Sequence, residues 1–410
     1  MGRVSVEILP FLETGAYQSA WVPISTVPDD VLDIGGLSQQ LDNTEFDLGV
    51  FKNSNVKLKV RNDHGRFSTV GQIGTLFQYR RSRSKVRFKW QPGGWPLICP
   101  FFEAGSPRAI LSEDVTAFEG LLNDLASASD IEMQDIDFQV LGYESLLGEM
   151  VVPYASVSNG DLFSLVLYTI CNQSPLKDLV TVSQANITAG SDQTIDDKTK
   201  LENKTALEAL RMILPVANAV LYVRDNVLYV KPRTASADLV FTFYGPGSAE
   251  GIENIIKIAP YRNGDHRIFN YLTWKDTTLL AQDATSVGSY GYLKKELSSD
   301  LITDTTKRNN ILAAVRDEFS QPKREMGLET FMTPETIALG LLDKVAVDYP
   351  SPTVPVEAEP TAYYDVDDYD TKYYSSEINA LTIEATARFK IMSRKVDFKK
   401  ETITFGLREV

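Results

Sequence analysis

Histidine is the side chain most often used as a general base or metal ligand, and the 410-residue chain contains only two, His64 and His266. Each stands among Asp, Asn and Gly residues of the kind that form turns, which favours a role in a surface turn. The sequence has no HExxH pair, no Gly-x-Ser-x-Gly elbow and no Walker loop. We therefore predict no catalytic residues, no bound cofactor and no enzyme activity.

Three segments approach a binding motif without completing it. Residues 245–251 hold three glycines after an expected strand, but the third falls one position late for a dinucleotide fingerprint, so a turn is favoured. Residues 365–370 offer carboxylates for Ca²⁺, yet Ser376 stands where such a loop needs its final Glu. Glu357 and Glu359 lie two residues apart in an expected loop, a poor geometry for a glycosidase pair. We expect no metal site.

Acidic residues outnumber basic ones, 55 to 41, which gives a net charge of −14 and argues against a general nucleic-acid or anionic-membrane coat. No apolar run approaches the roughly 20 residues of a membrane span, and the N-terminus lacks the apolar core of a signal peptide. With only Cys99 and Cys171, neither a disulfide scaffold nor a cysteine zinc site is expected. We predict a folded protein, made in the cytoplasm, that neither spans a membrane nor recognises a specific nucleic acid.

Positive charge is concentrated between residues 51 and 110, where twelve basic residues accompany two acidic ones. In 56–61 and 84–90, basic and apolar residues alternate, which predicts strands with one buried and one cationic face. This face is either solvated or a docking face for an acidic neighbour, such as a second copy of the chain. A nucleic-acid contact along 80–89 is a further hypothesis. The candidate interface residues are Arg80, Arg81, Arg83, Lys85, Arg87 and Lys89.

A second candidate surface lies between residues 348 and 374. Within 348–370, four prolines and seven acidic residues occur without a basic one, which predicts a long exposed loop. Tyrosine rings along it suit contacts with a protein or a sugar, so a receptor- or carbohydrate-binding module is an alternative function. The candidate contact residues are Tyr363, Tyr364, Asp367, Asp368 and Tyr369.

Period-two patterns dominate the rest of the chain and predict strands. A hairpin is expected at 219–231 around an Asp225-Asn226 turn, and a second at 395–407. Helices are expected at 161–172, 205–214 and 306–319. Asn159 or Asp161 is the expected cap of the first helix. Residues 111–125 fit a helix or a strand equally well, and both interpretations stay open.

These patterns divide the chain into three expected parts. Residues 1–155 are mostly β, residues 156–235 form a small α/β insert of helices and a hairpin, and residues 236–410 are again mostly β with helical inserts. The expected fold class is mainly β with an α+β insert.

Five segments resemble phrases of one family, the tail-hub or baseplate-hub proteins of tailed bacteriophages and related contractile injection machines. Residues 56–68 resemble an early strand that runs into an Asn-Asp-x-Gly-x-Phe turn, and residues 138–147 resemble the close of a first barrel. Residues 204–233 are similar to the inserted helix-and-hairpin domain, and residues 341–350 and 391–398 to the end of a second barrel. The resemblance spans most of the chain, although no single motif is diagnostic.

The resemblance implies two tail-tube-like antiparallel β-barrels and a small helix-and-hairpin domain in each chain. Three chains would form a ring with pseudo-sixfold symmetry, which matches a hexameric tail tube on one side and a trimeric central spike or fibre on the other. The implied partners are further copies of the chain, tail tube and distal-tail proteins, the spike or fibre protein and the tape-measure protein. The implied location is the virion tail tip or baseplate, with DNA passing through the ring.

The chain stops after its last expected strand, so the peptidoglycan-cleaving domain of some family members is expected to be absent. A hexameric distal-tail adaptor shares the barrel architecture and stays an alternative to the trimeric hub.

Overall fold

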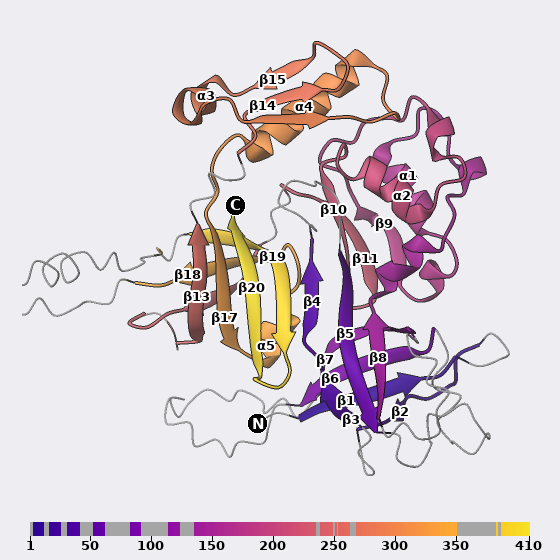
Figure 1. Ribbon diagram of the computed structural model, residues 1–410, viewed down its shortest axis with the longest axis vertical. Coiled ribbons are helices and arrows are strands. Elements are labelled where there is room, and N and C mark those ends of the chain that lie inside the picture. Colours follow the sequence, from indigo (N-terminus) through magenta and orange to yellow (C-terminus); the bar gives the residue numbers. More distant parts are fainter. Residues whose placement is uncertain are drawn as a thin grey trace, which may run out of the picture.

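The structure is a computed structural model, and it describes residues 3–11, 16–25, 31–41, 52–61, 83–91, 114–123, 135–234, 238–248, 251, 253–262, 268–350, 383 and 387–410. The described residues form mainly strands, with a few short helices between them. The predicted fold class, mainly β with an α+β insert, is confirmed. Figure 1 shows strands of the two ends of the chain in the lower part of the molecule and most of the helices above them.

The N-terminal β region contains eight strands within the described ranges. They are β1 (Arg3–Leu9), β2 (Val22–Pro23), β3 (Val31–Ile34), β4 (Leu37–Gln40), β5 (Lys52–Arg61), β6 (Lys85–Gln91), β7 (Val115–Asn123) and β8 (Asp135–Leu141). Strand β6 buries Val86, Phe88 and Trp90 and turns its basic residues to the other face, as its alternating pattern predicts.

The stretch that fitted both a helix and a strand is strand β7. It pairs antiparallel with β6 on one side and β8 on the other. Residues on both faces of β7 are buried, among them Ala117, Phe118, Leu121 and Leu122. A strand covered on both faces loses the strict alternation of apolar and polar residues, which is why its pattern was ambiguous.

The C-terminal β region has six described strands, ordered β12, β18, β19, β20, β17 and β13 across the sheet. They are β12 (Leu239–Tyr244), β13 (Ile255–Arg262), β17 (Glu325–Phe331), β18 (Lys344–Asp348), β19 (Arg388–Asp397) and β20 (Thr402–Glu409), with helix α5 (Pro334–Ala338) between β17 and β18. The predicted C-terminal hairpin is confirmed as β19 and β20. The predicted turn after β12 is also present, and Gly247 has the positive φ of 81° that glycine tolerates best.

The two β regions are joined edge to edge. Strand β4 pairs antiparallel with β19, from Leu37 opposite Val396 to Gln40 opposite Ser393. Fourteen of the described strands thereby form one sheet. One apolar core runs through both regions, with Phe88 stacked on Phe398 at 6.0 Å between ring centroids. Among the described strands the pairings follow an open path from β13 to β2, so the closure of each region into a barrel stays a prediction.

The insert between the β regions holds helices α1 (Phe163–Cys171) and α2 (Ala206–Ile213), strands β9 (Thr181–Ile187), β10 (Ala219–Arg224) and β11 (Val227–Pro232), and the short 3₁₀ turns η2 (Tyr143–Gly148), η3 (Tyr154–Ser156), η4 (Leu176–Asp178) and η5 (Lys198–Leu201). The predicted hairpin is confirmed, and Asp225 and Asn226 adopt φ angles of 49° and 58° at its turn. Helix α2 begins with a capping box between Thr205 and Glu208.

The predicted cap of the first helix is wrong. Helix α1 begins at Phe163, after Leu162, which has no side chain able to cap it. The Asp192 carboxylate accepts a hydrogen bond from the Ser164 N–H at 2.9 Å instead. The cap therefore comes from a residue distant in sequence. The side-chain amide oxygen of Asn159 instead accepts a hydrogen bond from the Lys198 N–H at 2.8 Å.

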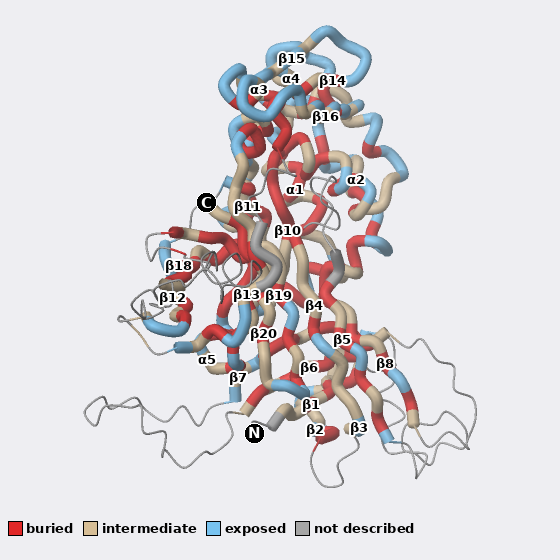
Figure 2. The backbone as a smooth tube through the Cα atoms, turned by 60° about the vertical axis from the view of Figure 1, so that its left-hand side comes forward, coloured by how far each residue is buried: buried red, intermediate tan, exposed pale blue. Residues whose placement is uncertain are grey.

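A further unit follows β13 and comprises β14 (Tyr271–Trp274), β15 (Leu280–Gln282), α3 (Ala284–Tyr290), β16 (Lys294–Leu297) and α4 (Thr305–Phe319). Helix α4 buries Ile311, Leu312 and Val315, as its spacing predicts. These side chains join the apolar core of the insert rather than that of the β regions. Figure 2 shows exposed residues around β15 and α3, at the end of the molecule far from the sheet.

None of the helices in the described ranges combines the length and the apolar character needed to cross a membrane.

Replacement of Phe405 by Ala should lower the free energy of unfolding by about 3 to 5 kcal/mol, because the substitution leaves a cavity in the core. Phe405 is fully buried, and its ring lies 5.6 Å from that of Phe243. Phe331 is the matched control, because it is also on a strand but is 58% exposed. Phe331→Ala should change stability by no more than about 0.5 kcal/mol in urea unfolding followed by circular dichroism. Equal effects of the two variants would contradict the described core.

Candidate interface and central cleft

The basic residues of β6 lie beside an acidic residue of β1. Glu7 sits opposite Arg87 in the sheet, and its carboxylate accepts hydrogen bonds from the Arg87 guanidinium and, at 3.1 Å, from the Lys89 ammonium. The three side chains are only 17 to 23% exposed. The predicted cationic face is therefore present, but a carboxylate of the same chain neutralises part of its charge.

Aromatic rings cover the same basic side chains. The Arg87 guanidinium lies 4.1 Å from the centre of the Trp21 ring, and the Lys85 ammonium lies 5.1 Å from the centre of the Tyr17 ring. Such cation–π contacts stabilise a charge that is partly removed from water. Burial raises the pKa of Tyr17 to about 12, and its hydroxyl donates to the Arg83 carbonyl oxygen at 3.0 Å. This phenol is therefore neutral at physiological pH.

The basic residues of β5 also face acidic residues. Lys59 pairs in register with Asp137 on β8, and its ammonium lies 2.9 Å from the Asp135 carboxylate. Both side chains of this ion pair are about 40% exposed, so it contributes little to stability. Its consequence is that the outer face of β5 and β8 carries mixed charge.

Arg83 is the most exposed of the described candidate interface residues. Its guanidinium lies 3.4 Å from the Glu149 carboxylate, and the two side chains are 48% and 67% exposed. Arg80 and Arg81 lie outside the described residues, as do all five candidate contact residues of the acidic loop, Tyr363, Tyr364, Asp367, Asp368 and Tyr369. Both candidate surfaces stay predictions.

Other residues named for their chemistry also fall outside the described ranges. They are His64, His266, Cys99, Glu357, Glu359 and Ser376, together with the acidic segment 365–370. Cys171 is described, and burial raises the pKa of its thiol to about 12, so the reactive thiolate is scarce at neutral pH. Among the described residues, no three His, Cys, Asp or Glu side chains gather as metal ligands.

A cleft of about 600 Å³ opens where the two β regions meet the tip of the β10–β11 hairpin. Its walls come from β7, from the hairpin tip around Asn226, from the segment 337–341 after α5, and from Arg394 on β19. No sequence pattern indicated this cleft, because the residues that line it are spread from position 39 to position 394.

Carboxylates of the N-terminal region line one side of the cleft. Glu144 is buried, its carboxylate accepts a hydrogen bond from the Ser54 N–H at 2.6 Å, and burial raises its pKa above the ordinary value. Glu119 accepts hydrogen bonds from the Tyr143 hydroxyl at 2.5 Å and, at 3.4 Å, from the Asn226 amide. Glu119 thereby connects the hairpin tip to the N-terminal region.

Arg224 connects the hairpin to the C-terminal region. Its guanidinium donates to the Asp343 carboxylate at 2.7 Å and to the Ala338 carbonyl oxygen at 2.7 Å. Asp343 also accepts from the Gly340 N–H at 2.8 Å. Polar contacts thus hold the hairpin tip against both β regions, with the cleft between these contacts.

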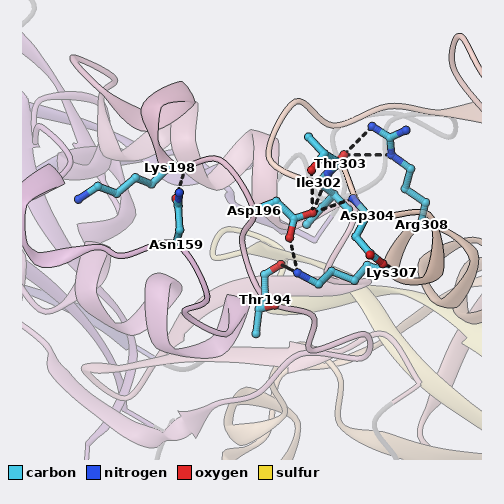
Figure 3. A network of polar contacts seen from close by, with 9 residues as sticks. All are labelled: Asn159, Thr194, Asp196, Lys198, Ile302, Thr303, Asp304, Lys307 and Arg308. Atoms are coloured by element: carbon cyan, nitrogen blue, oxygen red, sulfur yellow. Dashed lines mark hydrogen bonds and ion pairs between the residues drawn. The ribbon is translucent and has the colours of Figure 1, made fainter.

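A second polar junction links the insert to the α4 unit (Figure 3). The Asp196 carboxylate accepts hydrogen bonds from the N–H groups of Thr303 and Asp304 at 2.7 and 2.8 Å, and pairs with the Lys307 ammonium. The Asp196 N–H donates in turn to the Leu301 carbonyl oxygen at 2.9 Å. One carboxylate therefore satisfies donors at the start of α4 and ties two segments that are about 100 residues apart in sequence.

The pKa of Asp196 reflects this arrangement. Burial acts to raise it, but the hydrogen bonds and the ion pair with Lys307 together lower it from 3.8 to about 2. Because the folded protein prefers the ionised form, this carboxylate stabilises the fold fully above its unfolded pKa. The contribution is lost as pH falls from about 4 towards 2.

Asp196→Asn should lower the free energy of unfolding by roughly 2 kcal/mol at pH 7, which is the amount that a pKa shift of this size represents. The difference between variant and wild type should shrink between pH 4 and pH 2, measured by denaturant unfolding at each pH. Asp300→Asn is the matched control, because Asp300 is exposed and should change stability by no more than about 0.5 kcal/mol. A variant whose deficit does not depend on pH would contradict this role.

Comparisons with known proteins identify similar solved structures only. No protein-family model matches the chain, and no curated protein is similar to it in sequence. The tail protein from Neisseria meningitidis MC58 matches with a TM-score of 0.53 at 11% identity, over 100% of this chain and 96% of that one. The prophage MuSo2 43 kDa tail protein from Shewanella oneidensis matches with a TM-score of 0.49 at 12% identity, over 98% and 97% of the two chains.

A prophage tail protein, gp18 from Listeria monocytogenes EGD-e, matches with a TM-score of 0.49 at 10% identity, over 98% of this chain and 94% of that one. At these identities the matches speak to the fold alone. The fold of the Neisseria structure agrees with the resemblance drawn from the sequence, since the match covers both β regions and the insert of this chain. The chain has the fold of a tail protein.

Proposed function

We propose that the protein is a structural component of a phage-type tail, in which it forms the hub between the tail tube and the central spike or fibre. Three chains would form a ring with pseudo-sixfold symmetry, through which DNA passes. The tail tube and distal-tail proteins would contact one side of the ring and the spike or fibre the other, with the tape-measure protein as a further partner. The virion tail tip or baseplate is the proposed location.

The observation that carries this proposal is the pairing of β4 with β19, which places two β regions side by side in one sheet. A chain that presents two such regions supplies six of them when three copies assemble. A trimer can then match a sixfold tube and a threefold spike with the same molecule. The fold shared with a tail protein supports the same conclusion.

The charge distribution supports passage of DNA without binding it. The net charge of −14 disfavours adhesion to phosphates. Much of the described positive charge on β5 and β6 lies beside Glu7 and Asp135. A strand whose cations are already paired makes a weak electrostatic surface for nucleic acid, which favours the structural function over the nucleic-acid hypothesis.

The purified chain should form a trimer of about 137 kDa, given 45.7 kDa per chain, because the proposed ring closes with three copies. Light scattering on a size-exclusion column measures the mass, and negative-stain images of the same peak show whether a central hole is present. A hexameric ring would indicate the distal-tail adaptor instead. A chain that stays monomeric even when mixed with tail tube and spike proteins would contradict the proposal.

Charge reversal at Arg83 tests the proposed subunit face. Arg83→Glu should weaken self-association, because Arg83 is half exposed at the edge of the basic strand. Arg316→Glu is the control, since Arg316 lies on helix α4, away from this face, and pairs with the adjacent Asp317. Equal association of both variants, measured by sedimentation, would exclude Arg83 from the interface.

A further inference from the structure

Arg394 is a buried cation in the wall of the central cleft. Its side chain is 6% exposed and comes from β19, the strand that joins the two β regions. Burial, together with a smaller effect of the nearby Arg224, lowers the pKa of its guanidinium to about 10, although Asp225 and Asp343 act against this shift. Removing an arginine from water is unfavourable unless an anion or several hydrogen-bond acceptors compensate.

The contacts of Arg394 within the chain satisfy only part of the guanidinium. One terminal nitrogen donates to the Ile337 carbonyl oxygen at 2.8 Å, and the other is 3.5 Å from the Gln39 side-chain oxygen. Its Nε has no hydrogen-bond partner among the described residues. A guanidinium carries five N–H donors, so most of them have no close acceptor in the described part of the chain.

Arg394 forms no direct ion pair with a carboxylate of the described residues, although Asp225 and Asp343 favour its charged form electrostatically. Asp343, which follows the cleft-lining segment 337–341, already pairs with Arg224 and accepts a hydrogen bond from the Gly340 N–H. Glu144 on the far wall accepts from the Ser54 N–H, and Glu119 accepts from Tyr143 and Asn226. Three of the acidic residues near Arg394 therefore accept hydrogen bonds from other groups of the chain, and none of the three pairs directly with Arg394.

We propose that the central cleft binds a carboxylate, presented by an acidic side chain of a partner polypeptide, and that Arg394 is the residue that recognises it. A planar guanidinium with donors to spare matches the two oxygens of a carboxylate. The partner is a polypeptide rather than a free ion, because the cleft of about 600 Å³ is much larger than one carboxylate needs.

The lining of the cleft sets the character of this partner segment. Val115, Leu339 and Leu341 offer apolar surface to the residues that flank the acidic side chain. Asp114 and Asp225 also line the cleft and repel ligands with several negative charges. A segment with a single Asp or Glu among apolar or basic neighbours fits this combination, whereas a nucleic acid does not.

A blocked tripeptide, acetyl-Gly-Glu-Gly-amide, is the probe, and its neutral counterpart with Gln is the matched control. Titration into the full chain, followed by ligand-observed NMR, should give saturable binding with a Kd of about 1 mM or tighter, as expected for one small charged group. The Gln peptide should bind at least about tenfold more weakly, because it lacks the charge that the guanidinium recognises.

Two variants locate the site. Arg394→Gln should weaken binding of the Glu peptide at least about tenfold, which corresponds to the loss of one charge-assisted pair. Thr116→Trp should abolish binding without touching Arg394, because Thr116 is an exposed residue at the cleft that the indole would fill. Gln282→Trp is the control, since Gln282 is an exposed residue of β15, a strand that contributes nothing to the lining of the cleft, and it should bind as the wild type does.

The Thr116→Trp variant tests whether the peptide binds in the cleft even if the Arg394→Gln variant does not fold. Equal binding of the Glu and Gln peptides would overturn the proposal, as would unchanged binding by Thr116→Trp. No saturable binding below about 20 mM would also overturn it, since an affinity that weak is not specific. Tighter binding of inorganic sulfate than of the Glu peptide, lost in the Thr116→Trp variant, would assign the cleft to a free oxyanion and reject the polypeptide partner.

Discussion

The pairing of β4 with β19 is the constraint on which the rest of the structure depends. Four register positions join two sheets that would otherwise end in open edges, and an open edge is a site for pairing with other chains. The joint brings Gln39 and Arg394 together across 355 positions of sequence. Both residues line the central cleft together with the tip of the β10–β11 hairpin, which hydrogen bonds to Glu119 and Asp343 hold in place.

Local sequence patterns predicted the elements well where one face of an element meets the core and the other meets solvent. Neighbouring residues alone are enough to predict the alternation along β6 and the positive-φ turn at Asp225 and Asn226. The same approach left β7 undecided, because both of its faces are covered. It also failed at the start of α1, where Asp192 supplies the cap from 28 positions away.

Local sequence patterns were also insufficient for the candidate interface, because they do not show contacts with residues distant in sequence. The basic residues of β5 and β6 were recognised as a charged face from their own segment, but the residues that neutralise them, Glu7 and Asp135, belong to β1 and β8. A count of charge along the sequence cannot include partners that only the sheet brings alongside. The central cleft could not be predicted for the same reason, since its walls come from segments that are widely separated in sequence.

The shared core of the insert and the α4 unit has a consequence for how the protein is made. Phe163 and Leu210 pack in the same cluster as Ile311 and Val315, although the strands β12 and β13 are synthesised between them. During translation, the insert therefore leaves the ribosome with part of its apolar surface uncovered until α4 has emerged. A nascent chain stalled between the insert and α4 would expose that surface to chaperones. The rate at which this part of the chain is synthesised therefore affects how the protein folds.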